Sequence, residues 1–348
     1  MSEITLGIIG GGQLGSMLSI AAKKLNIKIV IYSDDKDAPA QHFCNEFIFA
    51  EYGNKEKILD FAQKVNVITF EFENIPFNTL NDLNKLRTVL PKPSVNRLIQ
   101  HRIAEKDFVN KLNIRTTRYS LVKNITDLEA LGDFLPGILK TTTLGYDGKG
   151  QYPIKNLEQI SSLSIDFSNE YILEKLVKLK KEISVIITRF GNNKYEIYEP
   201  VENTHEDQIL KYSKIPADIS EKLFSQSKLW AVQIAEEVKY IGTLCVEFFI
   251  DRNDNLYVNE IAPRVHNSGH LTINAYNVSQ FENHIRAVCS LEQISLKKIS
   301  DAEMINLIGN DITPYRENPK LNDNQFFFDY LKKKIKEKRK MGHLTTLK

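Results

Sequence analysis

The first part of the chain alternates between short apolar runs and segments whose apolar positions recur at helical spacing. Ile4–Ile9 is a largely apolar run typical of a buried strand. The apolar residues after it recur at helical spacing, as on one face of a helix: Leu14, Met17, Leu18, Ala21 and Leu25. Two more runs, Lys28–Tyr32 and Val67–Phe72, predict further strands. This alternation predicts a parallel sheet flanked by helices, with ligands bound at the carboxyl ends of its strands.

The segment Pro91-Lys92-Pro93-Ser94 interrupts this pattern and marks the first predicted domain boundary. The later pattern predicts a helix over Val95–Leu112 and then short strands with polar turns from Arg118 to Arg189. A second helix is predicted over Glu221–Val238, followed by a strand pair, Thr243–Ile250 and Leu256–Ile261. The last segment, Leu291–Lys348, is predicted to be mixed α and β. We predict three domains, 1–93, 94–291 and 292–348, and place a lid subdomain at about 115–180.

Composition indicates an ordinary globular chain. Its 348 residues carry a formal net charge of +2, so no overall field attracts nucleic acid or a membrane. Its three scattered cysteines fit neither a disulfide framework nor a zinc site, which indicates a reducing compartment. There is no apolar run of roughly 18 residues and no leader pattern. We expect a cytoplasmic protein that binds neither nucleic acid nor membranes.

The segment Lys332–Lys340 is the local exception, with seven basic residues and one acidic residue. It is either a solvated basic surface or a tail that binds an anion. A nucleic-acid-binding protein would use such a tail and would show a steep salt dependence. No other segment supports that alternative.

A glycine-rich loop, Gly10–Gly15, follows the first strand and satisfies G-x-G-x-x-G. Asp34 lies 19 residues further, at the end of the second strand, where a ribose-binding acid would sit. Alone, this pattern favours an NAD-dependent oxidoreductase. Glycines are also needed wherever a strand turns tightly into its helix, and such a loop could equally hold a substrate phosphate at the helix N-terminus.

A second glycine-rich loop follows a predicted strand, Pro136–Lys140, and runs to Gln151. Its three glycines, Gly145, Gly148 and Gly150, allow the backbone to bend over phosphates and present N–H donors. Lys140 and Lys149 would add positive charge. The loop does not match a P-loop, and a flexible hairpin with incidental lysines is the alternative.

Two glutamates lie on the predicted strand pair. If its turn closes symmetrically, position 250 faces 257 and Glu247 faces Glu260. Opposed like charges destabilise a sheet unless a cation lies between them, and Mg²⁺ (with Mn²⁺ as an alternative) prefers such carboxylates. Asn259 could add a ligand. The alternative is that one glutamate points to solvent and the pair is a coincidence.

The segment Ile261–His270 places Arg264, His266, Asn267, Ser268 and His270 directly after this strand pair. An arginine beside a metal–phosphate site can stabilise a transferring phosphoryl group. The histidines are candidates for acid, base or hydrogen-bond roles. Their spacing supports no Ser/His/Asp triad.

Together these motifs resemble the ATP-grasp superfamily, and within it the 5-(carboxyamino)imidazole ribonucleotide synthases of purine biosynthesis. The segments that carry the resemblance are collinear along almost the whole chain: GIIGGGQLG (7–15), FEFENIP (70–76), LKTTTLGYDGKGQ (139–151), EKLV (174–177), VEFF (246–249), NEIAPRVHNSGH (259–270), SQFENHIRA (279–287) and RKMGH (339–343).

The resemblance implies a mixed α/β and α+β fold, with a Rossmann-like preATP-grasp domain, a two-part ATP-grasp module and a small C-terminal α+β domain. It implies a ligase, commonly a homodimer, that uses ATP and Mg²⁺ to join bicarbonate to 5-aminoimidazole ribonucleotide. An ATP-grasp ligase that transfers a formyl or amino-acid group is the alternative within this class, and the HNSGH segment disfavours it.

The resemblance also implies residue roles. The ATP-binding positions would be Arg102, Lys140, Gly145, Tyr146, Asp147, Gly148, Lys149, Gly150, Gln151, Glu174, Lys175, Leu176, Val177, Glu182, His205, Asn259 and Glu260. Glu247 and Glu260 would hold the metal. The catalytic group would comprise Tyr146, Asp147, Arg264 and His266. The substrate would contact Gly12, Gln13, Leu14, Glu73, Asn267, Ser268, Lys332 and Arg339, the last two at the ribotide phosphate.

Several positions depart from the family's usual pattern. Ser16 replaces an arginine, Leu144 a glycine, Gln208 a glycine and Val265 a proline. In the tail, Phe328-Asp329-Tyr330-Leu331-Lys332 lacks the histidine and the glycine of the usual H-x-Y-G-K. The tail difference bears most directly on the predicted phosphate contact of Lys332.

Overall fold

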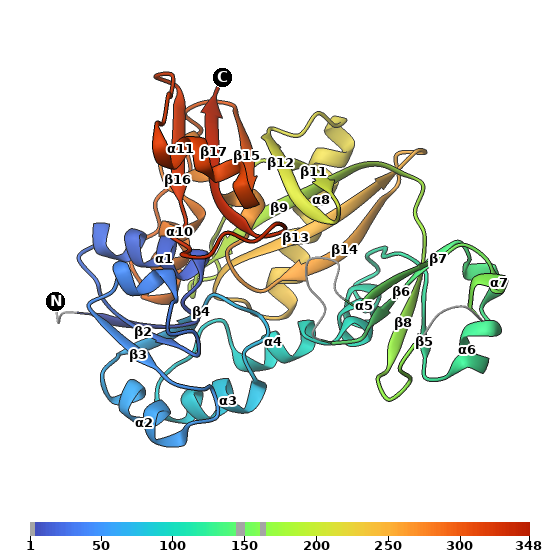
Figure 1. The fold of residues 1–348 in the computed structure, drawn as a ribbon, viewed down its shortest axis with the longest axis horizontal. Helices are drawn as coiled ribbons and strands as arrows, with labels where there is room; N and C mark the ends of the chain where they lie inside the picture. Colours follow the sequence, from blue (N-terminus) through green and yellow to red (C-terminus); the bar gives the residue numbers. More distant parts are fainter. Residues whose placement is uncertain (1–3, 144–149, 161–164) are drawn as a thin grey trace.

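The computed structural model describes residues 4–143, 150–160 and 165–348, and its strands form three sheets (Figure 1). In Figure 1 the N-terminal sheet lies at the lower left and the outlying sheet at the lower right, with the strands of the large central sheet above and between them. Across these described ranges, no helix is both long and apolar enough to cross a membrane.

The N-terminal sheet is parallel, in the order β3-β2-β1-β4. Its elements are β1 (Thr5–Ile9), α1 (Gln13–Lys24), β2 (Lys28–Ser33), the short helix η1 (Pro39–His42), β3 (Glu46–Phe49), α2 (Lys55–Gln63), β4 (Val67–Phe70) and α3 (Phe77–Leu86). The predicted Rossmann-like architecture is confirmed. The third predicted strand ends earlier, at Phe70 rather than Phe72. The edge strand β3 escaped prediction because only its Ile48 is buried.

The apolar face of α1 packs against α10 (Gln280–Val288), which lies far away in the sequence. One buried cluster contains Met17 and Leu18 of α1 together with Phe281 and Ile285 of α10. The N-terminal unit and the central part of the chain therefore share a core.

The helix predicted over Val95–Leu112 is two helices, α4 (Pro93–Ile99) and α5 (Arg102–Lys111). The chain leaves the helical conformation at His101, whose Nδ1 accepts a hydrogen bond from the Ala104 N–H at 3.4 Å. A residue that caps a helix cannot also lie inside one, so the single-helix prediction is wrong. The break places Arg102 at the first turn of α5.

The outlying sheet is antiparallel, in the order β5-β8-β6-β7. Its elements are β5 (Tyr119–Val122), α6 (Ile125–Glu129), η2 (Gly132–Phe134), β6 (Gly137–Thr141), β7 (Gln151–Ile154), α7 (Leu157–Ile160) and β8 (Tyr171–Lys175). It has its own buried cluster, which includes Val122, Leu139 and Leu173. These elements fall within the predicted lid subdomain, 115–180.

The central sheet follows the order β14-β13-β9-β11-β12-β15-β17-β16, and β10 also pairs with β9. Its strands are β9 (Leu179–Arg189), β10 (Tyr195–Ile197), β11 (Val201–Glu206), β12 (Ile209–Ile215), β13 (Gly242–Asp251), β14 (Leu256–Ala262), β15 (Ala302–Ile308), β16 (Gln325–Asp329) and β17 (Lys340–Leu347). The associated helices are α8 (Glu221–Glu237), η3 (Asn267–Gly269), α9 (Thr272–Ala275), η4 (Gly309–Ile312) and α11 (Thr313–Glu317).

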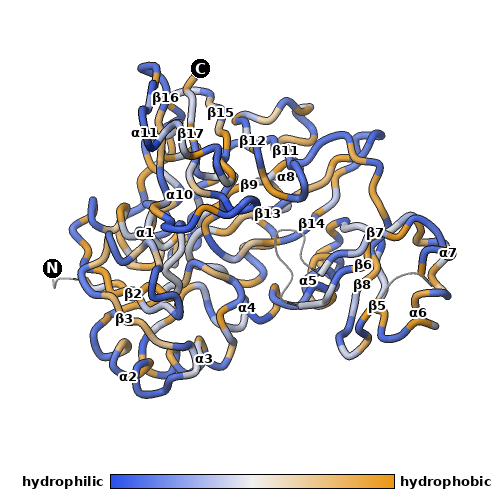
Figure 2. Tube along the Cα trace, viewed as in Figure 1, coloured by the Kyte–Doolittle hydropathy of each residue, from blue (hydrophilic) through white to orange (hydrophobic). Residues whose placement is uncertain are grey.

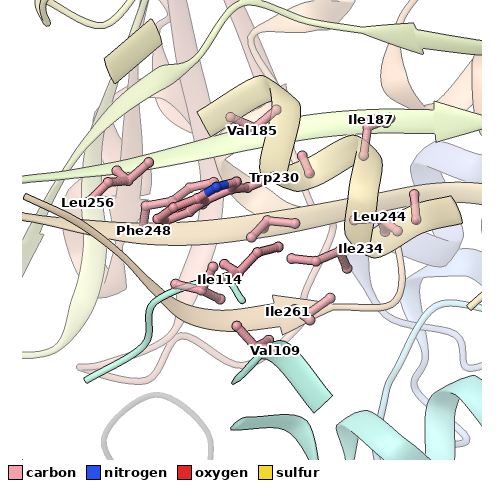
Figure 3. Packing of buried hydrophobic residues seen from close by; sticks show 14 of the residues in the cluster. Val109, Ile114, Val185, Ile187, Trp230, Ile234, Leu244, Phe248, Leu256 and Ile261 are labelled. Carbon is pink, nitrogen blue, oxygen red and sulfur yellow. The ribbon is translucent and has the colours of Figure 1, made fainter. Parts of the chain in front are cut away.

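Helix α8 covers one face of β9 and β13. Figure 3 shows Trp230 of α8 packed over Phe248 of β13, with ring centroids 6.4 Å apart, and Val185 of β9 and Ile114 in the same cluster. This core supports the back of the β13–β14 hairpin, which carries the two glutamates singled out by sequence.

The hairpin register differs from the one predicted. Ile250 pairs with Leu256, not with residue 257, so the turn is one residue tighter. A β-bulge then adds a residue to β14, and Glu247 pairs with Glu260 as predicted. Two residues, Asn259 and Glu260, thus follow Val258 opposite Glu247. The expected pairing is confirmed, but the symmetric turn used to derive it is wrong.

The central sheet continues without interruption into the C-terminal part of the chain, because β12 pairs antiparallel with β15. The predicted boundary at residue 292 therefore crosses a shared sheet. Figure 2 colours the loop between β16 and β17, which contains all of the basic segment 332–340 except Lys340, mostly as hydrophilic. That loop lies beside α1 and the central sheet in Figure 1.

Candidate active site

Glu247 and Glu260 lie opposite each other on β13 and β14, with side chains 13% and 43% exposed. Burial alone would raise the pKa of Glu247, but the adjacent His266 and more distant cations outweigh it and lower that pKa to about 2. The carboxylate of Glu260 lies 3.4 Å from the guanidinium of Arg102. Both side chains can therefore present negatively charged oxygens.

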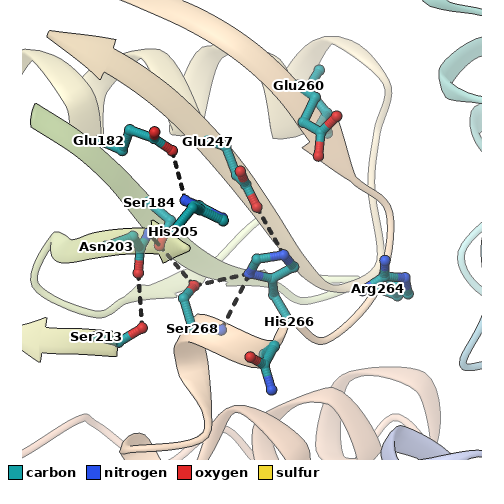
Figure 4. A network of polar contacts seen from close by, with 12 residues as sticks. Glu182, Ser184, Asn203, His205, Ser213, Glu247, Glu260, Arg264, His266 and Ser268 are labelled. Carbon is teal, nitrogen blue, oxygen red and sulfur yellow. Dashed lines mark hydrogen bonds and ion pairs between the residues drawn. The ribbon is translucent and has the colours of Figure 1, made fainter. Parts of the chain in front are cut away.

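His266 connects Glu247 to a chain of buried hydroxyls. Its Nε2 lies 2.8 Å from Glu247 Oε1, and its Nδ1 lies 2.8 Å from Ser268 Oγ. Ser268 in turn contacts Ser184 Oγ of β9 at 2.7 Å. Figure 4 shows the Glu247 carboxylate pointing at the His266 ring and the hydroxyl chain behind it. The imidazole is thus held at both nitrogens.

The two glutamates fit a hard divalent cation. Opposed carboxylates on neighbouring strands repel each other, and a cation between them would remove that cost. Mg²⁺ binds through one or two carboxylates plus water and phosphate oxygens. Cys245 also brings a ligand atom within 4.8 Å of those of Glu247 and His266, but burial raises the pKa of its thiol well above the usual value. A neutral thiol is a poor ligand, so the glutamate pair is the better candidate.

Arg264, just after β14, forms a short ion pair with Glu73 of the N-terminal unit. Burial would raise the pKa of Glu73, but the Arg264 guanidinium lowers it overall. Both groups therefore stay charged. This pair joins the segment after the β13–β14 hairpin to the loop after β4, at the carboxyl edge of the parallel sheet.

A buried cluster of two lysines and one glutamate lies between α5 and the outlying sheet. Lys140 Nζ of β6 donates to Glu174 Oε2 at 3.0 Å, and Lys106 Nζ of α5 lies 3.5 Å from Glu174 Oε1. Burial would raise the pKa of Glu174, but the two lysines lower it to about 2. One carboxylate facing two ammonium groups leaves a net positive charge, which suits a nucleotide phosphate.

Sequence reasoning missed Lys106 and its neighbour Glu105. Lys106 also donates to the backbone carbonyl of Asn259 at 3.2 Å, so it links α5 to the bulge of β14. Glu105 accepts the Ile261 N–H at 2.6 Å. Burial, reinforced by the charge of Glu260, raises the pKa of Glu105 to about 8. Both residues looked like ordinary surface charges of an amphipathic helix.

The predicted nucleotide hinge, Glu174–Val177, comprises the last two residues of β8 and the first two residues of its connection to β9. Lys175 Nζ donates to the Asp133 carbonyl at 2.8 Å, and Leu176 is 51% exposed. Further along β9, Glu182 lies 2.8 Å from His205 Nδ1 of β11. Burial would lower the pKa of His205, but Glu182 raises it overall. The structure thus pairs the predicted ribose-binding Glu182 with His205.

The first glycine-rich loop is occupied by Glu71, which the sequence analysis also missed. Its carboxylate accepts the Gly12 N–H at 2.8 Å and the Gly15 N–H at 3.2 Å. A Cβ on Gly10 would fall 2.7 Å from the Glu71 side chain, and Gly10 also has a φ of +97°. Two backbone N–H groups at the start of α1 therefore already have an acceptor within the protein. This geometry disfavours a dinucleotide pyrophosphate at that position.

The predicted substrate-binding residues around this loop differ in exposure. Leu14 is buried in the core shared with α10. Gln13 contacts the ammonium of Lys332 from the C-terminal loop. Lys332 Nζ also donates to the Lys340 carbonyl at 2.7 Å, and Arg339 Nη1 donates to the Lys334 carbonyl at 3.3 Å. The basic segment therefore folds back on itself beside α1.

Three comparisons with known proteins bear on the whole chain. Residues 3–100 match a ribonucleotide synthetase preATP-grasp domain, residues 107–281 an ATP-grasp domain, and residues 302–348 a phosphoribosylaminoimidazole carboxylase C-terminal domain. An N5-carboxyaminoimidazole ribonucleotide synthase of Bacillus subtilis is 38% identical over 347 residues, which cover 99% of this chain and 91% of the relative.

The chain belongs to the N5-carboxyaminoimidazole ribonucleotide synthase family.

Solved structures of this synthase family agree with the fold. The Staphylococcus aureus enzyme complexed with ADP is 37% identical, with a TM-score of 0.91 over 99% of this chain and 93% of that one. The Aspergillus clavatus enzyme, in complex with ADP and 5-aminoimidazole ribonucleotide, is 26% identical, with a TM-score of 0.91 over 99% and 94% of the two chains. The expected fold class and an ATP-grasp ligase of purine biosynthesis are confirmed, and the oxidoreductase alternative is wrong.

Within this synthase fold, several predicted site residues converge on the β13–β14 hairpin, namely Arg102, Glu247, Asn259, Glu260, Arg264, His266 and Ser268. Gly150 and Gln151 adjoin Lys140, because Gln151 pairs with it across β6 and β7. Gly145, Tyr146, Asp147, Gly148 and Lys149 lie outside the described residues. The roles of all these residues remain predictions.

The structure shows the surroundings or backbone angles of four residues that differ from the usual synthase pattern. Ser16 is fully buried and its hydroxyl donates to the Gly12 carbonyl at 3.1 Å, so it closes the first turn of α1. Val265 is also fully buried, in the core that holds α1 and α10. Gln208 and Leu331 both have positive φ, of 66° and 54°, where the family usually has glycine.

Proposed function

We propose that this protein carboxylates the exocyclic amine of 5-aminoimidazole ribonucleotide, using ATP and bicarbonate and releasing ADP and phosphate. The observation that carries this proposal is the placement of Glu247 and Glu260 face to face, beside His266 and the charged Arg264–Glu73 pair. The hairpin thus supports a site for a metal-bound phosphate next to a site for a small anionic acceptor.

ATP would lie between the outlying sheet and the hairpin. Lys140 and Arg102 would contact its phosphates, and the backbone of 175–177 and Glu182 would contact the nucleoside. Glu247 and Glu260 would hold Mg²⁺, which would neutralise charge on the terminal phosphates when bound. In favour of this arrangement, Lys140 and Arg102 each face a carboxylate that already holds them in position.

The first chemical step joins bicarbonate to the terminal phosphorus of ATP. A bicarbonate oxygen forms a bond to the γ-phosphorus while the bond to the β-bridging oxygen breaks, giving ADP and carboxyphosphate. Negative charge grows on the transferring group and on the leaving oxygen. Lys140 and Arg264 would spread that charge, because fixed cations in a partly buried site cost no reorganisation during the reaction.

The second step transfers the carboxyl group to the ribotide. The amine nitrogen forms a bond to the carboxyl carbon, directly or after release of CO₂, and phosphate leaves. The amine loses a proton, and we assign Asp147 as its acceptor. His266 would orient the acceptor end, since Glu247 and Ser268 fix its ring at both nitrogens. Lys332 and Arg339 would bind the ribotide phosphate.

The decisive experiment follows oxygen from bicarbonate. With ¹⁸O-labelled bicarbonate, one labelled oxygen should appear in the released phosphate, because the attacking oxygen stays on phosphorus. ADP release should require both the ribotide and bicarbonate, which are omitted in turn as controls. Unlabelled phosphate would reject carboxyphosphate, and ADP release that needs no bicarbonate would favour the formyl- or amino-acid-transferring alternative.

We further propose that the protein acts as a cytoplasmic homodimer, as its family resemblance implies. Sedimentation or light scattering of the full chain tests the dimer. A monomeric mass at micromolar concentration would contradict it.

A further inference from the structure

Asn267, next to His266, uses its side chain to attach the loop to the C-terminal strands. Its Nδ2 donates to Asn306 Oδ1 at 3.1 Å, and Asn306 Nδ2 donates back to Asn267 Oδ1 at 2.5 Å. Asn306, on β15, also donates to the Leu210 carbonyl at 2.9 Å. Both amides are buried, at 7% and 0% exposure. Two reciprocal bonds between buried amides fix the position and the orientation of the loop.

Tyr330, after β16, holds the same amide from a second side. Asn267 Nδ2 lies 3.4 Å from Tyr330 Oη, and that oxygen lies 3.1 Å from His343 Nδ1 of β17. A hydroxyl that accepts the Asn267 N–H keeps its own proton for the imidazole nitrogen. Burial lowers the pKa of His343 to about 3, so this imidazole is neutral and can accept. Phe328 stacks on His343, with ring centroids 5.4 Å apart.

The ring of Tyr330 has a different neighbour. The ammonium of Lys332 lies 5.3 Å from the ring centroid, within the range of a cation–π contact. Leu331 between them has a φ of +54°. The hydroxyl of Tyr330 therefore contacts the loop that carries His266, and its ring contacts Lys332, which is predicted to bind the ribotide phosphate.

We propose that Tyr330 is a positioning residue that sets the distance between the Asn267 loop and Lys332, which form the two halves of the substrate site. Its hydroxyl holds the Asn267 loop, which orients the group that receives the carboxyl, and its ring holds Lys332, which grips the phosphate end of the same ribotide. This inference rests on the proposed function. It adds that carboxyl transfer depends on Tyr330, although the tyrosine need not touch the reacting atoms.

Two substitutions of Tyr330 distinguish the role of its hydroxyl from the role of its ring. Tyr330→Phe removes the hydroxyl and keeps the ring. The Asn267 loop should therefore lose its hydrogen bond to residue 330, while the ammonium of Lys332 keeps its contact with the aromatic ring. We expect kcat for carboxylation to fall by about 3- to 10-fold, the equivalent of one hydrogen bond, with the KM for the ribotide nearly unchanged. Tyr330→Leu removes the ring as well and should raise that KM by about 3-fold or more. Tyr315→Phe is the matched control, because its ring stacks on Phe327 away from this site.

The readout that a merely structural role would not change is the coupling ratio. Carboxylated product, followed by ¹³C NMR from labelled bicarbonate, is compared with ADP release. We expect nearly one product per ADP in the wild-type protein and fewer in Tyr330→Phe, because carboxyphosphate would form but transfer less often. An unchanged ratio in Tyr330→Phe would overturn the inference, whether both rates fall together or neither falls. If the wild-type protein itself shows no ribotide-dependent turnover, the proposed function fails instead. Should Tyr330→Leu not fold, Tyr330→Phe still decides.

Discussion

Leu331 and Gln208 hold backbone angles that disfavour residues with a side chain. Their φ values are 54° and 66°, and Asp207, at 47°, precedes Gln208 in the two-residue turn between β11 and β12. A left-handed residue costs roughly 1–2 kcal/mol unless it is glycine, although glycine adds entropy to the unfolded chain.

We therefore predict that Leu331→Gly and Gln208→Gly each raise the free energy of unfolding by about 1 kcal/mol. Leu331 is 40% exposed, so little packing is lost. Urea denaturation measures the change. Leu321→Gly, at a similarly exposed residue (39%) without a positive φ, should be neutral or destabilising. If Leu331→Gly is no more stable than this control, the positive φ of Leu331 does not destabilise the folded protein.

Glu105 gives a pH dependence whose sign follows from burial. Its pKa rises from 4.5 to about 8 on folding, so the folded chain holds a proton that the unfolded chain loses between these values. Stability should therefore fall as pH rises through this window, by at most about 1.4 kcal/mol per pH unit. Glu105→Gln keeps the oxygen that accepts the Ile261 N–H and cannot lose a proton.

We expect the Glu105→Gln variant to gain stability relative to the wild-type protein as pH increases from 5.5 to 7.5. The measurement is urea denaturation at several pH values, without nucleotide and with a chelator. Glu129→Gln, at an exposed position on α6, serves as the control. Parallel stability curves for Glu105→Gln and wild type would show that Glu105 is ionised in the folded protein.

Helix α5 joins the outlying sheet to the β13–β14 hairpin. Lys106 contacts Glu174 of β8 and the carbonyl of Asn259 in the β14 bulge. Burial lowers the pKa of Lys106, and Glu174 opposes that shift. Removing one member of a buried pair costs about 3–5 kcal/mol, and here Lys140 still offsets part of the charge of Glu174.

We predict that Lys106→Met lowers the free energy of unfolding by about 3 kcal/mol and raises the KM for ATP more than the KM for the ribotide. The reason is that the hinge strand β8 loses its link to α5, whereas the ribotide residues lie elsewhere. Lys111→Met, at an exposed position on the same helix, is the matched control. Equal melting temperatures for the two variants would contradict the role given to Lys106.

At the scale of elements, periodicity was informative where one face is buried and uninformative where it is not. The strands of the central hairpin and the long helix α8 follow from their apolar patterns. The edge strand β3 and the break between α4 and α5 do not, because exposure and a capping histidine leave little apolar signal. The bulge at Asn259 was equally invisible, since a bulge depends on partners from another element, here the ammonium of Lys106.

The candidate site shows the same division. Residues in dense polar motifs, such as Arg264 and His266, could be named as candidates from sequence, and the structure places both near the β13–β14 hairpin. Glu71, Lys106 and Tyr330 were missed as functional candidates because each acts through a contact made more than 50 residues away or through another side chain. Only the folded chain shows that Glu71 fills the first glycine loop, which a motif alone would assign to a dinucleotide.

At the scale of the whole molecule, the central sheet and the outlying sheet differ in how they are attached. β15 and β17 continue the central sheet from β12, and Tyr330 lies in the core shared by α1 and α10. The outlying sheet instead has a separate core of its own, formed by residues between Val122 and Leu173. The central sheet and the outlying sheet should therefore unfold locally at different free energies.

We therefore predict that the C-terminal strands exchange their amide hydrogens together with β12 and β13, while the outlying sheet exchanges at a lower free energy. Native-state hydrogen exchange by mass spectrometry at increasing denaturant measures this order. Because Asn306 of β15 is tied to Asn267 beside the active site, opening of β15 would also release the loop that carries His266. Saturating ADP should protect the outlying sheet most, since its predicted contacts to nucleotide join it to the central sheet. If β15 and β17 instead exchange early and independently of β12, the C-terminal strands form a separately folding domain, and the link from Tyr330 to the active-site loop would be too weak to position it.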